Sequence, residues 1–83
     1  MNKMYATVLE AFADIVKVGP KGQVEADAAF ALFAAKAGAS PQTIADAVSC
    51  TCEDAVRLRF MGVEMLRDAS FASRFNGLLQ LVQ

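Results

Sequence analysis

The stretch from Thr51 to Asp68, TCEDAVRLRFMGVEMLRD, constrains the fold most, because as one helix it carries apolar residues on two separate ridges. The first ridge recurs at spacings of three and four, which is typical of a stripe that faces a core, and consists of Leu58, Met61, Met65 and Ala69. The second follows the same spacing and consists of Val56, Phe60 and Val63. A helix with two apolar sides requires two sets of neighbours. We expect the second set to be either another molecule or residues 71–82.

The composition points to association with other protein chains. The sequence has 83 residues, which predicts a single small domain spanning 1–83, and 55% of them are hydrophobic, with a mean hydropathy of +0.36. Typical globular proteins contain about 45–50% apolar residues. A small domain has little interior relative to its surface, so part of the apolar excess is expected in an interface. We therefore predict a homo-oligomer, most simply a dimer, or a complex with an obligate partner.

Charge and residue content disfavour several functional classes. Eight basic and nine acidic side chains give a net charge of −1, without the basic excess that phosphate neutralisation usually requires. Histidine is absent, which removes the commonest general base and metal ligand. Two cysteines alone cannot complete a tetrahedral zinc site within one chain. We expect no enzymatic activity, no cofactor and no bound metal.

The same residues bear on the cellular compartment. No run of residues reaches the roughly 18–20 consecutive apolar positions that span a bilayer, so we expect no membrane segment. Glu10 and Asp14 interrupt what would be the apolar region of a signal peptide. Cys50 and Cys52 are separated by one residue and cannot form the framework of a disulfide-rich secreted scaffold. The expected compartment is the cytoplasm.

Helical periodicity continues before this stretch. The pattern predicts a first amphipathic helix over residues 2–18, ended by Gly19-Pro20, with Lys21-Gly22 as a mobile turn. A second helix is predicted from Val24 to Ala37, with Gly38 as its C-cap. Its expected inward face consists of Ala26, Ala29, Phe30, Phe33 and Ala37.

Local capping signals divide the rest of the chain. Ser40-Pro41 predicts an N-cap followed by proline at the first helical position, opening a short helix over 41–48. Thr51 is the predicted N-cap of the 51–69 helix, and Ser70 that of a last helix over 71–82. Asn76-Gly77 leaves open a helix that ends at Phe75, followed by an extended tail. The predicted fold is a compact all-α bundle of four to five helices, with a central helix near 51–69.

Residues 42–60, QTIADAVSCTCEDAVRLRF, resemble the helix-turn-helix motif. Ala45 stands where the motif has a small residue, and Ser49 stands where its turn usually has glycine. The resemblance implies that the second helix enters the DNA major groove with Thr51, Cys52, Glu53 and Arg57, while Arg59 helps to neutralise the phosphate backbone. The acidic Glu53 and Asp54 at the start of this helix oppose that interpretation.

Residues 38–49, GASPQTIADAVS, loosely resemble a stretch of the carboxymuconolactone decarboxylase family, which implies a similar helical turn. The Cys-x-x-Cys and upstream histidine of that family are absent. Cys50 and Cys52 flank a predicted helix N-terminus, which stabilises thiolates, so a thiol-redox protein is a third hypothesis. The competing interpretation is that Cys50 packs as a small apolar residue.

The hypothesis that accounts for most of these features is a small protein-interaction module, acting as an adaptor, an inhibitor or an assembly subunit. It would bind a partner protein through exposed apolar helix surface. The predicted binding residues are Val56, Phe60, Val63, Arg67 and, near the N-terminus, Met4.

Overall fold

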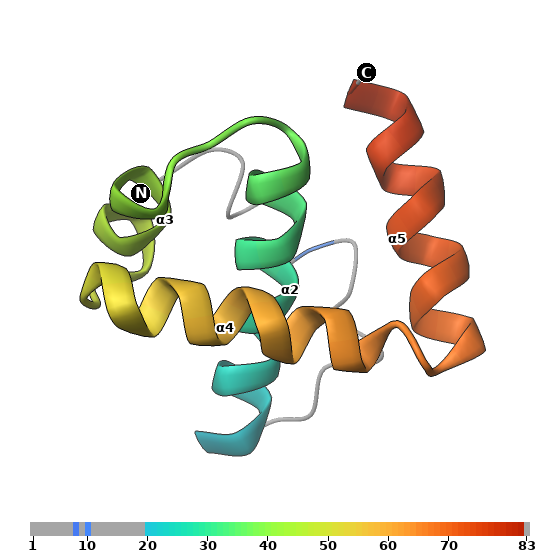
Figure 1. The fold of residues 1–83 in the computed structure, drawn as a ribbon. Helices are drawn as coiled ribbons and strands as arrows, with labels where there is room; N and C mark the ends of the chain where they lie inside the picture. Colours follow the sequence, from blue (N-terminus) through green and yellow to red (C-terminus); the bar gives the residue numbers. More distant parts are fainter. Residues whose placement is uncertain (1–7, 9, 11–19, 83) are drawn as a thin grey trace.

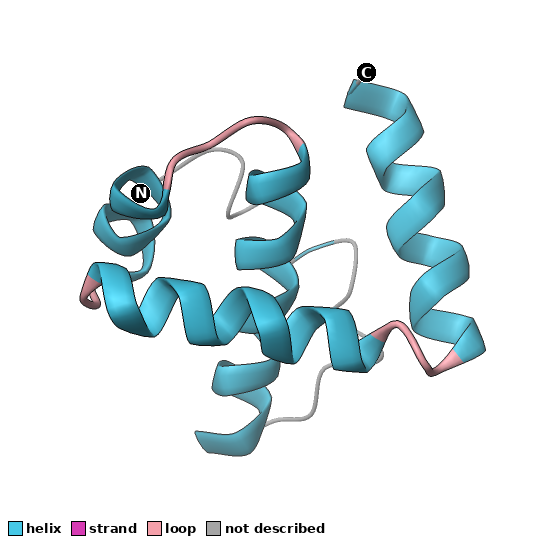
Figure 2. Ribbon diagram, viewed as in Figure 1, coloured by secondary structure: helices cyan, strands magenta, loops and turns pink. Residues whose placement is uncertain are grey.

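The computed structural model describes residues 8, 10 and 20–82, and the regular structure in this part of the chain is helical (Figures 1 and 2). Between residues 20 and 82, four helices follow one another: α2 (Pro20–Lys36), α3 (Pro41–Val48), α4 (Cys52–Met65) and α5 (Ala69–Val82). The radius of gyration is 11.4 Å, close to the roughly 12 Å of a compact chain of this length. The predicted compact all-α fold is confirmed for the described residues.

The predicted helix over residues 2–18, and Met4 with it, lies outside the described residues, apart from two positions. Val8 and Glu10 are helical, as expected, and Val8 is completely buried while Glu10 is exposed. Val8 joins the same apolar cluster as the phenylalanines of α2 and α5.

The centre of the fold is α2, and not the 51–69 helix that the sequence pattern favoured. Residues 28–34 of α2 are all buried, which covers nearly two consecutive helical turns. A helix that is apolar all round must have neighbours on every side. α4 runs across α2, α3 lies beside its C-terminal half, and α5 stands on the far side (Figure 1). Alanine-rich α2 is narrow enough to accept these neighbours at close range.

The beginning of α2 differs from the prediction, and its end agrees. The second helix was expected to start at Val24, but α2 starts at Pro20, and Lys21 and Gly22 are helical instead of forming a mobile turn. The predicted end of the preceding helix at Gly19 lies outside the described residues. Proline is accepted in the first turn because its missing N–H has no partner there in any helix. At the other end, α2 stops at Lys36, and Gly38 adopts a left-handed φ of 98°, as a glycine cap should.

The predicted caps of α3 and α4 are confirmed. The Ser40 hydroxyl accepts a hydrogen bond from the Thr43 N–H at 3.2 Å, and proline occupies the next position. The Thr51 hydroxyl accepts one from the Asp54 N–H at 3.1 Å. Each cap satisfies an N–H that has no partner within the helix, which determines where the helix begins.

The junction between α4 and α5 lies earlier than predicted. α4 ends at Met65, and the Asp68 carboxylate accepts a hydrogen bond from the Phe71 N–H at 3.0 Å. Asp68, and not Ser70, therefore caps α5. The helix continues through Asn76-Gly77 to Val82, so the alternative of an extended tail after Phe75 is wrong.

Aromatic side chains attach α5 to the core. Phe75 meets Phe33 of α2 edge to face, with ring centroids 5.9 Å apart, and lies 5.8 Å from Phe71. Edge-to-face pairs add roughly 0.5–1.5 kcal/mol to the gain from burial. The predicted inward residues Ala26, Ala29, Phe30 and Phe33 are all buried, whereas Ala37 lies beyond α2 and is exposed.

Candidate interaction surface

The buried face of α4 is made of small residues. Ala55 and Gly62 are buried, and Leu58 and Met65 pack against the core at the same helical spacing. A Cβ atom placed on Gly62 would lie 2.7 Å from the Ala28 carbonyl oxygen and from the Leu32 Cβ. The backbones of α4 and α2 therefore approach as closely as glycine permits.

This close approach corrects the predicted core ridge. Leu58 and Met65 do pack on the core, but Met61 is 41% exposed, and Ala69 is exposed and belongs to α5. Gly62 takes the place that the spacing assigned to Met61. A methionine side chain would hold the two helices apart, so α4 turns its glycine inward instead.

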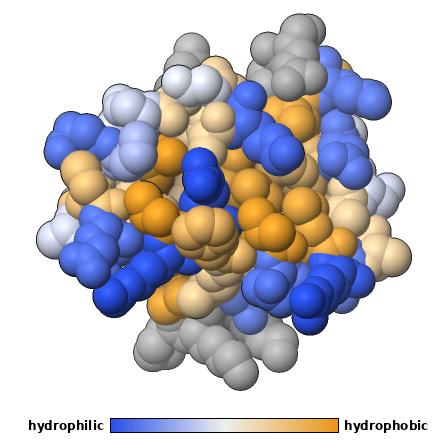
Figure 3. Space-filling view, viewed as in Figure 1, coloured by the Kyte–Doolittle hydropathy of each residue, from blue (hydrophilic) through white to orange (hydrophobic). Residues whose placement is uncertain are grey.

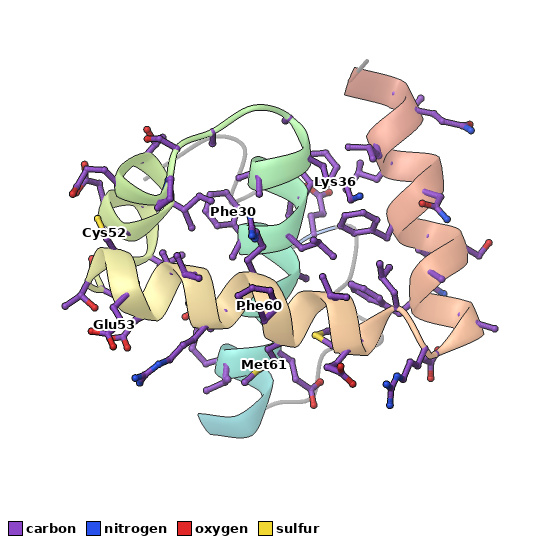
Figure 4. The ribbon with its side chains drawn as sticks, in the orientation of Figure 1. Phe30, Lys36, Cys52, Glu53, Phe60 and Met61 are labelled. Carbon is purple, nitrogen blue, oxygen red and sulfur yellow. The ribbon has the colours of Figure 1, made fainter. Side chains whose placement is uncertain are left out.

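In the second apolar ridge of α4, Phe60 lies on the side of the helix away from α2, and Val56 and Val63 lie nearer to α2 (Figure 4). Phe60 is 59% exposed, Val63 is 47% exposed and Val56 is partly buried. At about 100° per residue, Phe60 lies opposite the buried pair Ala55 and Gly62. Figure 4 shows Phe60 on the side of α4 away from α2. With Phe60 and Val63 this exposed, the ridge does not lie under residues 71–82.

A groove runs beside this ridge, between α4 and the C-terminal half of α2. It is open, has a volume of about 380 Å³, and is lined by Leu32, Ala35, Lys36, Arg59, Phe60, Val63 and Leu66. A smaller hollow next to it also uses Ala35 and Arg59 and includes Val56. Figure 3 shows apolar surface across the middle of this face, bordered by hydrophilic side chains. We call Val56, Phe60 and Val63, together with the lining of this groove, the Phe60 surface.

Charged residues follow α4 along the other side of the ridge. Arg57 pairs with Glu53 at 3.1 Å and with Asp54 at 3.8 Å, and Arg67 pairs with Glu64 at 3.3 Å. All of these side chains are exposed, so each pair contributes little to stability. Arg59, by contrast, lies on the groove side of the ridge, and its guanidinium is 5.4 Å from the centroid of the Phe60 ring, a distance suited to a cation–π contact.

The residues that the helix-turn-helix resemblance assigns to the DNA major groove lie at or near the start of α4. Ser49, in the turn between α3 and α4, adopts the left-handed conformation (φ 58°, ψ 51°) at the position where the motif usually has glycine. Thr51, Cys52 and Arg57 are exposed there (Figure 4 labels Cys52 and Glu53). Arg57 is held by two carboxylates, so this end of the helix presents more negative than positive charge.

Cys50 does not have the surroundings of an activated thiol. Burial raises the pKa of the Cys50 thiol, and nearby Asp54, Asp27 and Cys52 raise it further. Its Sγ donates to the Thr51 carbonyl oxygen at 3.3 Å, while the Cys52 Sγ donates to Gln42 Oε1 at 2.9 Å. Reactive cysteines need a lowered pKa, and the raised pKa of Cys50 is opposite to the effect we expected from the helix N-terminus.

Over the described residues, no polar or charged side chain is buried, and no group of three or more potential metal ligands forms. No helix in the same part of the chain is both long and apolar enough to cross a membrane. No family model matches the sequence, and no curated protein or solved structure shows significant similarity to it.

The contribution of α2 to the groove was not apparent from the sequence. Leu32, Ala35 and Lys36 reach the Phe60 surface only because α4 crosses α2 at Gly62. The one available signal was Gly62 itself, since a glycine within a helical pattern often marks a close backbone approach.

Proposed function

We propose that this chain is a small protein-interaction module that binds a partner protein through the Phe60 surface. The observation that carries the proposal is the position of Phe60, on the side of α4 opposite the core and 59% exposed. At this position a phenylalanine adds little to the packing of the monomer. Aromatic residues of this kind are enriched among the side chains that dominate binding energy.

The surroundings of Phe60 support a binding surface over a single exposed side chain. Isolated apolar residues are common on protein surfaces, but Val63 is also exposed and both residues border the groove lined by Leu32 and Leu66. Arg67, predicted as part of the site, is exposed just beyond the C-terminal end of α4. Fully burying a phenylalanine gains about 1.5–3 kcal/mol. Because Phe60 is 59% exposed, covering it gains about 1–2 kcal/mol, which corresponds to roughly 5–30-fold in affinity.

The runner-up function is DNA binding by a helix-turn-helix, which the left-handed Ser49 favours. The carboxylates around Arg57 weigh against it, because they repel phosphates at the end of α4 that would enter the groove.

Substituting Phe60 tests the proposal. The wild-type chain and the Phe60→Glu variant are immobilised and exposed to extract of the source cells, and the proteins retained by each are compared. We expect the wild type to retain a protein, which can be the chain itself, and Phe60→Glu to lose it by at least about tenfold. Met61→Glu is the matched control, since Met61 is also exposed but lies away from the groove.

Circular dichroism and thermal unfolding check that the variants remain folded. Equal retention by the wild type and Phe60→Glu would show that the surface is not used. If Phe60→Glu unfolds, Val63→Glu provides the same test at a less exposed position on the same groove.

A further inference from the structure

We infer that the occupant of the Phe60 surface is a second copy of this chain, with the two α4 helices packed antiparallel about a two-fold axis beside Phe60. The inference rests on the proposed function, because it identifies the partner at that surface. A symmetric dimer needs a patch that is complementary to itself. The order of charges along α4 satisfies this requirement.

Four exposed charges near the outer side of α4 alternate in sign along the chain, in the order Glu53, Arg57, Glu64 and, just beyond the end of the helix, Arg67. Asp54 and Arg59 lie farther round the helix, about 100–120° from Phe60. Glu53 is seven residues before Phe60, and Arg67 is seven residues after it. Arg57 is three residues before Phe60, and Glu64 is four residues after it. An antiparallel pairing centred on Phe60 therefore places Arg57 opposite Glu64 of the second copy, and Glu53 opposite Arg67.

The two sides of the ridge also match. At about 100° per residue, Val56 and Val63 lie roughly 40–60° to one side of Phe60, and Arg57 and Glu64 lie by a similar angle to the other side. A two-fold axis perpendicular to antiparallel helices keeps each side against its own counterpart. Valines then meet valines, Phe60 meets Phe60, and the charged row meets the charged row.

A parallel pairing fails the same comparison. It would bring Glu53 beside Glu53 and Arg67 beside Arg67 of the second copy, and like charges facing each other oppose association. In the antiparallel arrangement, the ion pairs Glu53–Arg57 and Glu64–Arg67 of each chain join into networks of four alternating charges. The carboxylate of Asp68 is engaged with the Phe71 N–H, as the cap of α5.

A charge-exchange experiment tests this register. Arg57→Glu and Glu64→Arg are made in separate chains, and each variant is examined alone and as an equal mixture by sedimentation equilibrium. Each variant alone places two pairs of like charges across the axis, so we expect self-association at least about tenfold weaker than that of the wild type. The mixture restores opposite charges at both positions, and we expect a one-to-one heterodimer with close to wild-type affinity.

Several outcomes decide between the possibilities. A mixture that associates no more tightly than either variant alone, or a wild type that stays monomeric at all concentrations, would overturn the inference. If a monomeric wild type still retains a different protein in a Phe60-dependent manner, the proposed function survives without the dimer. Should Phe60→Glu alter neither self-association nor retention, both are wrong.

Folding of the variants is checked separately, because each exchange also places like charges on one helix. The carboxylate introduced by Arg57→Glu would lie near Glu53, and the guanidinium introduced by Glu64→Arg would lie near Arg67. If either variant unfolds, the pair Glu53→Arg and Arg67→Glu examines the same two-fold axis. Restored association in that mixture supports the inference, and its absence contradicts it.

Discussion

At Gly62, the absence of a side chain allows α4 to lie directly against α2. The atoms nearest to an added Cβ would be the Ala28 carbonyl oxygen and the Leu32 Cβ, both at 2.7 Å, and backbone atoms cannot move aside cheaply. Gly77, in the middle of α5, has open space where its side chain would be. The two glycines occupy the same kind of secondary structure in opposite packing environments.

Replacing each glycine by alanine is predicted to change stability in opposite directions. Gly62→Ala should destabilise the fold by about 1–3 kcal/mol, because the gain in helix propensity is smaller than the cost of separating α4 from α2. Gly77→Ala should stabilise it by roughly 0.5–1 kcal/mol. Urea unfolding followed by circular dichroism measures both. Equal effects of the two substitutions would show that α4 and α2 are not in close contact.

At the scale of the elements, hydrogen bonds at the helix ends determine where each helix begins. Ser40 and Thr51 cap α3 and α4 as their sequence context predicts. At α5, two candidates stand two residues apart, and Asp68 is the one whose side chain reaches the Phe71 N–H. A carboxylate also interacts more favourably than a hydroxyl with the positive end of the helix dipole.

Alanine substitutions distinguish the two candidate caps of α5. Asp68→Ala should cost about 1 kcal/mol of unfolding free energy, because the Phe71 N–H loses its partner. Ser70→Ala should change the unfolding free energy by less than about 0.5 kcal/mol, since Ser70 is an exposed residue inside the helix. The comparison uses the same urea titration. A larger loss for Ser70→Ala would assign the cap to Ser70 after all.

For the whole molecule, the distribution of charge bears on the two proposed classes of partner, a protein and a nucleic acid. The net charge is −1, and Arg57, near the start of α4, is matched by carboxylates at 3.1 and 3.8 Å. DNA binding depends on uncompensated positive charge, which releases counterions from the phosphates. The charged DNA backbone offers no apolar surface that would cover Phe60.

We therefore predict no detectable binding to duplex DNA at about 50 mM salt. Fluorescence anisotropy with a labelled duplex measures this, and the double variant Glu53→Gln/Asp54→Asn is the informative comparison, because it frees Arg57. Wild-type binding that weakens steeply as salt is added would instead support the helix-turn-helix hypothesis.

The sequence by itself determined the helical class, the caps at Ser40 and Thr51, the glycine at the end of α2, and the buried alanines and phenylalanines of that helix. These features depend on interactions between residues a few positions apart, so the local sequence pattern predicts them directly. The predicted turn at Lys21-Gly22 was wrong because a proline can open a helix at its first position, as Pro20 does in α2.

Only the tertiary structure decided which face of α4 is buried. Two ridges of similar apolar character competed, and periodicity alone favoured the one that includes Met61. The close crossing at Gly62 requires small residues, so α4 turns Ala55 and Gly62 inward and Phe60 outward. The groove beside Phe60 combines residues of α2 and α4 that are more than 20 positions apart in the chain. Contacts at that separation depend on how helices cross, which is a property of the packed molecule and not of either helix alone.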